Sequence, residues 1–242
     1  MIRQLADQTG SKELISMKNM TQDKAYEKGI GFQFVEPVKL GPIVSYSLRY
    51  DPIHLSFVLA RYKFVARILG GKKRVLEIGC GDAFGTPIVA QFVEKLLAID
   101  IDARLIQSNK ERLKFLKNVE FATMEFGRVV PAGKFDAIFA VDVIEHVDPQ
   151  KTEVFFNKIS QSLEPHGVCL LGTPNIKAKK YASPQSAIQH INTKVQDHVV
   201  LKDNLSGYFH NLFLFGMNDE VVHTGFLAMA HYLWALGVGA KS

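Results

Sequence analysis

The chain contains little cysteine and no long apolar run. Its two cysteines, Cys80 and Cys169, are too few for a disulfide framework or a four-cysteine zinc site. No apolar stretch reaches the roughly 18 residues that a membrane-spanning helix needs. Residues 1–21 are polar and mixed in charge, without the apolar core of a signal peptide. We therefore expect a cytoplasmic protein with no membrane span and no metal site.

The charge balance is only mildly basic. The sequence of 242 residues carries a net charge of +5 and a pI near 9.1, and 22% of its residues are charged. Its lysines and arginines are dispersed and form no concentrated basic stripe, which argues against nucleic acid as a partner. A mild positive charge is compatible with an anionic small molecule.

The chain consists of two regions with different sequence patterns. Residues 1–53 show no sustained period, and residues 29–52 are rich in glycine, proline and aromatics, so we expect an irregular N-terminal extension that packs on or caps the active site. A helix over residues 54–69 opens the main domain, 54–242. Arg61 falls between two apolar stripes of this helix and needs an anionic partner, either a bound carboxylate or an internal acid.

From residue 74 onward, strand and helix patterns alternate. Strands are predicted over 74–78, 96–100, 119–123, 135–141, 168–172, 209–215 and 231–238, and helices over 84–94, 103–116 and 149–163. Asp102 and Asp148 precede the last two helices as N-caps. This order predicts an α/β fold: a doubly wound, Rossmann-like, mostly parallel seven-stranded sheet with helices on both faces.

A glycine loop directly follows the first predicted strand. The sequence Val-Leu-Glu-Ile-Gly-Cys-Gly-Asp-Ala-Phe-Gly spans residues 75–85. Gly79 and Gly81 allow a sharp turn and a close approach to a ligand, and the following helix offers free N–H groups. Asp100 ends the next strand, roughly 20 residues after Gly81, which is the spacing of a ribose-binding acid in a nucleotide-binding β-α-β unit.

Together, Glu77, the glycine loop and Asp100 resemble the S-adenosylmethionine (SAM) pocket of class I methyltransferases. The stretch 135–147, with Glu145-His146 after the fourth strand, resembles the small-molecule, glycan-type subgroup of that family. The resemblance implies SAM as cofactor and a last strand inserted antiparallel beside strand six. Nucleic-acid methyltransferases of the same fold are an alternative. Their fourth strand is followed by an Asn/Asp-Pro-Pro-aromatic turn, which this sequence lacks.

The resemblance also assigns roles along the cofactor. Glu77 would order the loop near the methionine amino group, Asp100 would accept hydrogen bonds from both ribose hydroxyls, and Asp142 would face the sulfonium. The remaining expected contacts with SAM are the loop residues Gly79, Cys80 and Gly81, the residue after the ribose acid, Ile101, the residue near adenine, Met124, and Arg61, whose anion the SAM carboxylate could supply.

His146 is the candidate general base, because the pKa of a histidine lies near 6.5 and suits proton transfer from a hydroxyl. His190 is the reserve candidate, and each histidine also has a purely structural interpretation. We expect a methyltransferase acting on a hydroxyl of a small or carrier-linked acceptor, such as a sugar or surface-glycan precursor. A nucleic-acid methyltransferase and a non-catalytic SAM-binding regulatory protein are the alternatives, and the oligomeric state is left open.

Overall fold

The computed structural model describes residues 35–181 and 197–241. The chain divides into two compact units, Met1–Val38 and Lys39–Ser242, and the fold below is that of the second unit. Its start at Lys39 differs from the expected boundary at residue 53, because the segment 39–53 packs with the main domain. No helix in the described ranges is long and apolar enough to cross a membrane.

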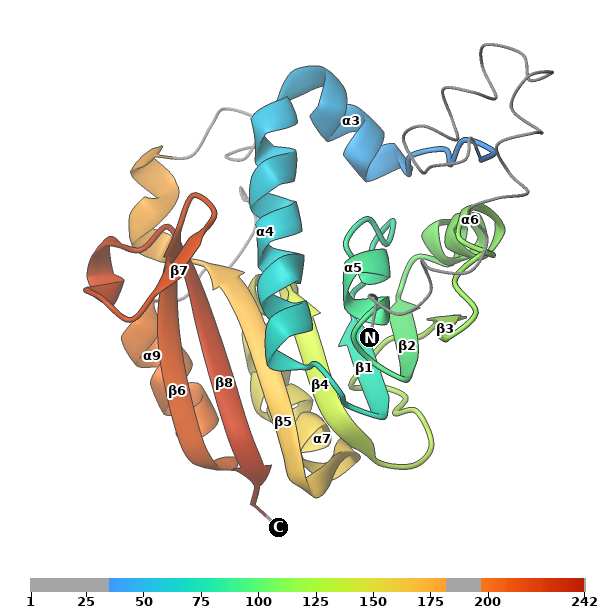
Figure 1. Cartoon of the computed structure of the whole chain (residues 1–242). Coiled ribbons are helices and arrows are strands. Elements are labelled where there is room, and N and C mark those ends of the chain that lie inside the picture. Colours follow the sequence, from blue (N-terminus) through green and yellow to red (C-terminus); the bar gives the residue numbers. More distant parts are fainter. Residues whose placement is uncertain (1–34, 182–196, 242) are drawn as a thin grey trace, which may run out of the picture. The chain divides into compact units, whose positions relative to one another are not determined.

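One sheet of eight strands forms the centre of this unit (Figure 1), in the order β3-β2-β1-β4-β5-β8-β6-β7. The strands β3, β2, β1, β4 and β5 are parallel, and β8 is inserted antiparallel between β5 and β6, as expected. The predicted seven strands are confirmed, and a short edge strand, β7, makes the eighth. The bounds are β1 Arg74–Ile78, β2 Lys95–Asp100, β3 Val119–Thr123, β4 Phe135–Val141, β5 Leu163–Pro174, β6 Phe209–Asn218, β7 Val221–His223 and β8 Tyr232–Ala240.

The helices differ from their predictions mainly at their ends. They are α3 Pro42–Tyr50, α4 Pro52–Ile68, α5 Thr86–Ala90, α6 Ala103–Arg112, α7 Thr152–Ser162 and α9 His198–Ser206. Asp102 and Asp148 accept backbone hydrogen bonds as predicted caps, but Asp148 begins a 3₁₀ turn, η3 Pro149–Lys151, before α7. The expectation of an irregular segment through residue 52 is wrong, since α3 begins at Pro42, where proline suits a first helical turn.

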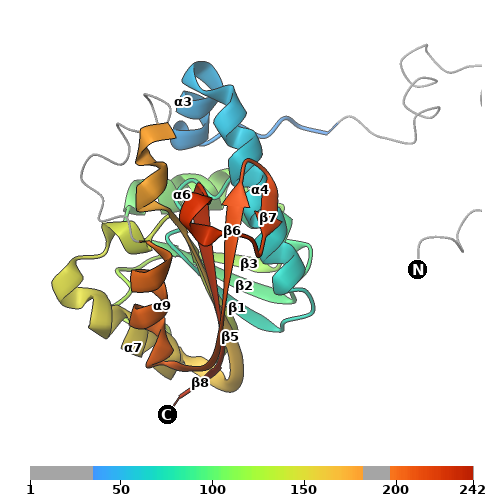
Figure 2. The ribbon, with the colours of Figure 1, turned by 90° about the vertical axis from the view of Figure 1, so that its left-hand side faces the viewer.

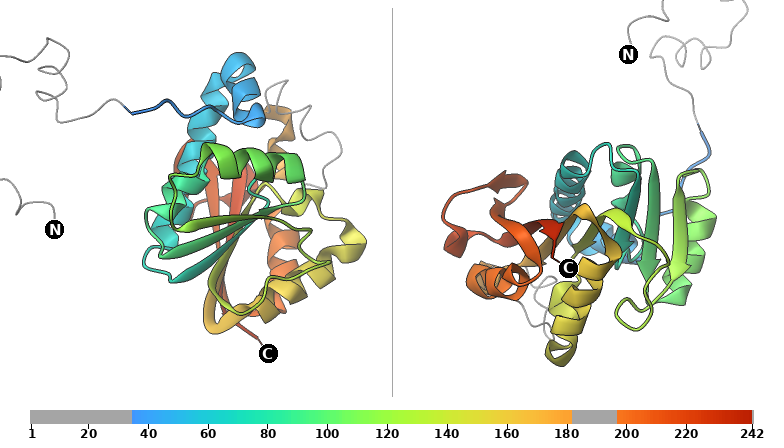
Figure 3. Two further views of the ribbon diagram at one scale, coloured as in Figure 1. Left: turned by 90° about the vertical axis from the view of Figure 1, so that its right-hand side faces the viewer. Right: turned by 90° about the horizontal axis from the view of Figure 1, so that it is seen from below.

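Alternation along the strands builds two apolar layers. In β4, Ala137, Phe139 and Val141 face α4 and α5, whereas Ile138 and Ala140 face the layer that contains α7 and α9. Figure 2 shows α7 and α9 on one side of the sheet and α4 on the other. Helix α6 packs against β2 and β3 (Figure 3). The carboxyl ends of the parallel strands therefore meet at one end of the sheet, which is where open α/β sheets bind their ligands.

Candidate cofactor and acceptor site

The glycine loop leaves β1 in a conformation that favours glycine. Gly79 and Gly81 have φ angles of +74° and +54°. A Cβ on Gly79 would lie 2.4 Å from a methyl carbon of Val143. The amides of Gly79 and Cys80 both donate to the carbonyl of Ile99, at 2.8 and 3.0 Å. The loop is thus held between the ends of β1 and β2, with its backbone close to β4.

Glu77 is buried at the end of β1 and both of its oxygens accept hydrogen bonds. The Tyr62 hydroxyl donates to Oε1 at 2.9 Å, and the Thr86 hydroxyl donates to Oε2 at 2.8 Å. Burial raises the pKa of Glu77 to about 7. These bonds connect α4 and the first residue of α5 to the strand that leads into the glycine loop.

Asp100 faces the loop from the end of β2. Its Oδ2 accepts from the amide of Gly81 at 2.8 Å, and its Oδ1 accepts from the amide of Asp102 at 2.9 Å. Each carboxylate oxygen has a second lone pair, so a diol could still bind. Beside it, Ile101 is 68% exposed, and the amide of Met124 donates to the carbonyl of Asp100 at 2.9 Å. The expected ribose and adenine residues therefore share one edge.

Cys80 is buried within the loop, and its thiol lies next to the side chain of Asn109. The side-chain nitrogen Nδ2 of Asn109 lies 3.8 Å from the Cys80 sulfur and donates a hydrogen bond to the carbonyl of Gly81 at 2.8 Å. Burial raises the pKa of the Cys80 thiol, which keeps it protonated. Its contribution to the site is the backbone conformation of the loop.

Helix α3 and the residues before it contact the same loop. Asp82 accepts a hydrogen bond from the Val44 amide at 2.9 Å, and a Cβ placed on Gly81 would lie 3.5 Å from Cδ1 of Ile43. Arg112 donates to the carbonyls of Asp82 and Lys39. The loop is therefore bordered by a helix that the sequence patterns did not predict.

The end of β4 carries an ion pair in which Arg61 is largely buried and the Asp142 side chain is 32% exposed. Asp142 has a φ of +56°, uncommon for a residue with a side chain. Its Oδ2 lies 2.7 Å from Nη1 of Arg61, and the Arg61 guanidinium lies 4.1 Å from the ring centroid of Tyr232. Of the two partners left open for Arg61, the structure contains the internal acid.

Glu145 lies next to this pair in the 3₁₀ turn η2, Ile144–His146. It is 1% exposed, and its Oε2 accepts from the Thr173 hydroxyl at 3.0 Å. Burial, and then the negative charge of Asp142, raise the pKa of Glu145 to about 8. Its Oε1, together with Oδ1 of Asp142 and the Tyr232 hydroxyl, is buried without a hydrogen-bond partner among the described residues.

Of the two histidines predicted as candidate bases, the structure describes only His146. His146 is exposed at the end of η2 and its backbone amide donates to the carbonyl of Val143. Its ring makes no hydrogen bond with the part of the chain that the structure describes. His190 lies outside the described residues.

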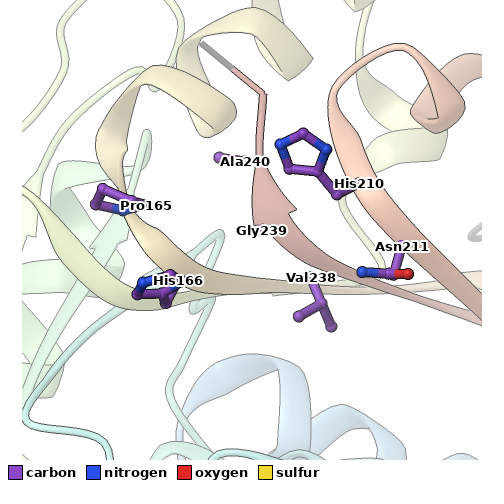
Figure 4. A pocket seen from close by; sticks show the side chains of 7 residues that line it. All are labelled: Pro165, His166, His210, Asn211, Val238, Gly239 and Ala240. Atoms are coloured by element: carbon purple, nitrogen blue, oxygen red, sulfur yellow. The ribbon is translucent and has the colours of Figure 1, made fainter.

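A separate hollow of about 500 Å³ lies at the opposite edge of the sheet (Figure 4). It is lined by Pro165 and His166 of β5, His210 and Asn211 of β6, and Val238, Gly239 and Ala240 of β8. Parallel α/β sheets bind ligands at the carboxyl ends of their strands, so this hollow is not the cofactor site.

The fold and the glycine loop define a domain of the class I methyltransferase type, and comparison with known proteins agrees. Residues 76–171 match the family described as "Methyltransferase domain". The ubiquinone biosynthesis O-methyltransferase of Bradyrhizobium diazoefficiens is 26% identical over 55% of this chain and 55% of its own length. The cyclopropane-fatty-acyl-phospholipid synthase of Escherichia coli is 26% identical over 68% of this chain and 47% of its own length.

Among solved structures, the N-methyltransferase NodS of Bradyrhizobium japonicum, in complex with S-adenosylhomocysteine (SAH), superposes with a TM-score of 0.57. It is 17% identical, and the match covers 81% of this chain and 92% of NodS. The chain spans about half the length of the curated relatives it matches. Residues 76–171 thus match a methyltransferase domain, and the fold is that of solved methyltransferases, one of them with bound SAH.

Several residues of the site were not predicted from the sequence. Tyr62, Thr86 and Tyr232 carry ordinary core-like patterns, and Glu145 was interpreted only as part of the Glu-His pair. The signal that could have found Glu145 is its place in a turn between two apolar residues, Ile144 and Val147. Tyr232 comes from the antiparallel β8, and only the strand order brings it beside Asp142.

Proposed function

We propose that this chain transfers the methyl group of SAM to a hydroxyl of a small or carrier-linked acceptor, such as a sugar or surface-glycan precursor. The observation that carries the proposal is the pairing of two sites at one edge of the sheet. The glycine loop and Asp100 lie at the ends of β1 and β2, and a buried polar cluster lies at the ends of β4, β5 and β8.

The first site fits the cofactor. Gly79 and Gly81 supply half-buried backbone without side chains, Asp100 retains lone pairs for the ribose diol, and Ile101 and Met124 would border adenine. SAM, when bound, supplies an activated methyl group on a sulfonium. The residues of this chain align the acceptor with that group, and such alignment is the main source of rate in methyl transfer. Helix α3, through Ile43, caps the loop.

The second site fits a hydroxyl. A hydroxyl both donates and accepts a hydrogen bond, and the cluster offers two carboxyl oxygens and one phenol without partners in the described chain. A relative of this chain is named an O-methyltransferase of ubiquinone biosynthesis, which supports transfer to oxygen. His146 and His190 are candidate bases for the proton that leaves the hydroxyl.

The test is a screen for SAH formation. The protein is incubated with SAM and a panel of nucleotide sugars, lipid-linked sugars, catechols, primary amines and RNA, and SAH is quantified by mass spectrometry. We expect SAH and an O-methylated product only with hydroxyl compounds. SAH formed with amines or RNA alone would contradict transfer to a small-molecule hydroxyl. SAM binding by calorimetry without turnover on any member would favour a regulatory SAM-binding protein.

A further inference from the structure

Three buried side-chain oxygens, two just after the carboxyl end of β4 and one on the first residue of the antiparallel β8, have no well-formed hydrogen bond among the described residues. They are Oδ1 of Asp142, Oε1 of Glu145 and the hydroxyl of Tyr232, and of these the Tyr232 hydroxyl and the Asp142 carboxylate lie close enough to interact with each other. Glu145 is 1% exposed and Tyr232 is 3% exposed, so water is largely excluded from both side chains. A buried polar group without a partner costs free energy, and several together indicate a place that a ligand completes.

The three groups share one electrostatic environment. Asp142 and Tyr232 both contact the side chain of Arg61, a residue of α4. The charge of Asp142 raises the pKa of Glu145 and adds to the effect of burial on the pKa of Tyr232. The Arg61–Asp142 pair is neutral as a unit, so Glu145 is the group whose charge can still change.

The cluster lies directly beside the expected methyl donor. Val143, the residue after Asp142, packs a methyl carbon against Gly79 of the cofactor loop. Glu145 follows two residues later and is tied to β5 through Thr173. Strands β1 and β4 are neighbours in the sheet, so the loop after β1 and the turn after β4 lie side by side at the carboxyl ends of these strands.

Building on the proposed function, we propose that Glu145 is the catalytic residue that accepts the proton of the acceptor hydroxyl through Oε1, while Asp142 and Tyr232 position that hydroxyl. The acceptor oxygen forms a bond to the methyl carbon, the bond between methyl carbon and sulfur breaks with its electron pair going to sulfur, and the hydroxyl proton passes to Oε1. The step needs no co-reactant beyond SAM and the acceptor. In this proposal Glu145 takes the role of base in place of His146, which is exposed on the same turn.

The charged and titratable groups that face Glu145 determine its pH dependence. Within the described part of the chain these are Asp142 after β4, Arg61 on α4 and Tyr232 on β8, with the neutral Thr173 on β5. The raised pKa, about 8, makes Glu145 a stronger base when ionised, but it is mostly protonated at pH 7. The rate of methyl transfer should therefore rise as the pH increases through about 8.

The first test follows the carboxyl itself. The protein is labelled with ¹³C at glutamate side chains and titrated by NMR with saturating SAH or SAM. We expect one carboxyl to titrate near pH 8, and its signal to be lost in Glu145→Gln and kept in the exposed control Glu164→Gln. Replacing SAH by SAM adds a positive sulfonium and should weaken proton binding at this carboxyl about tenfold. Identical titrations with SAH and SAM would overturn the proposal.

The second test follows turnover, using the hydroxyl compound of the panel above that yields most SAH. Glu145→Gln should slow single-turnover methyl transfer by about 10²–10⁴-fold, remove the rise near pH 8, and leave the SAM dissociation constant and melting temperature close to wild type. His146→Ala should keep the same pH profile. A normal profile in Glu145→Gln, or its loss in His146→Ala, overturns the assignment of Glu145 alone. Failure of the wild-type protein to bind SAM in calorimetry would instead overturn the proposed function itself.

Discussion

The hydroxyl of Tyr62 donates a hydrogen bond to Oε1 of Glu77 at 2.9 Å, and both groups are buried. The contact joins α4 to the strand that leads into the glycine loop. A Cβ on Gly85 would lie 2.0 Å from the Tyr62 ring, so glycine is required where the loop passes this ring. One tyrosine therefore fixes the distance between α4, β1 and the start of α5.

Removing this hydroxyl should destabilise the domain. In Tyr62→Phe the ring still packs, but Oε1 of Glu77 loses its donor in a buried place, which costs about 1–3 kcal/mol. We expect urea unfolding to show that loss, with SAM affinity reduced several-fold because the loop is less well ordered. Tyr46→Phe, which removes a hydroxyl from an exposed tyrosine, is the matched control. Equal stability of the two variants would show that the Tyr62–Glu77 bond contributes nothing.

Stability should also depend on pH through Glu77. Its pKa is raised from 4.5 to about 7, so the native state binds the proton more tightly than the unfolded state. The stabilisation is complete below about pH 4.5 and is lost as the pH rises to about 7, and its full size is about 3 kcal/mol. Glu145 acts in the same direction up to about pH 8.

Glu77→Gln tests that sign. The amide keeps the shape and can accept from Tyr62 while donating to Thr86, but it cannot ionise. Urea unfolding between pH 5 and pH 8 should therefore show a smaller loss of stability with rising pH in Glu77→Gln than in wild type. The remaining slope combines Glu145 with His54, whose pKa is lowered by burial and which therefore acts in the opposite direction. Glu164→Gln should retain the wild-type slope. A wild-type protein whose stability increases over this interval would contradict the assignment.

The sequence predicted the sheet well because its strands are short, apolar and bounded by clear turn residues. β1, β3 and β4 have the predicted bounds, and the antiparallel β8 lies where the resemblance placed it. Helix α3 was missed because glycine, proline and aromatic residues around it hide its period. β7 has three residues and depends on pairing with β6, which no local pattern specifies.

The sequence determines the arrangement of the proposed cofactor side more completely than that of the proposed acceptor side. Glu77, Gly79, Gly81 and Asp100 lie within one β-α-β unit, so their spacing along the chain determines their positions. The acceptor side brings together residues far apart in the sequence, from Arg61 to Tyr232. Such contacts depend on strand order and helix packing, and the partner of Arg61 could not be chosen from periodicity.

Substitution of Asp100 should lower the affinity for SAM. Asp100→Asn weakens the acceptor for the Gly81 and Asp102 amides and for the ribose diol. We expect SAM affinity to fall about tenfold or more, because charge-assisted hydrogen bonds are worth roughly 1.5–3 kcal/mol. Calorimetry measures this directly.

Asp136 offers a matched control at the other end of the sheet. Its carboxylate also accepts from two backbone amides, those of Lys73 and Arg74, at 3.0 and 2.8 Å. Asp136→Asn should lose similar stability with unchanged SAM affinity. If both variants bind SAM as wild type does, Asp100 is a structural acid and the ribose assignment is wrong.

Arg61 should prove to be a structural residue whose loss exposes the charge of Asp142. Arg61→Met keeps most of the packing against Tyr232 but leaves Asp142 without its cation, and because the Asp142 side chain is partly exposed we expect a loss below the roughly 3–5 kcal/mol of a fully buried pair. Because Nη1 of Arg61 already binds Oδ2 of Asp142, we expect SAM affinity to change less than threefold.

The double variant Arg61→Met with Asp142→Asn removes both charges, and asparagine tolerates the positive φ at this position. It should therefore recover much of the stability that Arg61→Met loses. Urea unfolding of the two single variants and the double variant gives the coupling energy between the residues. Additive losses, or a large fall in SAM affinity in Arg61→Met, would show that Arg61 acts on the cofactor carboxylate instead.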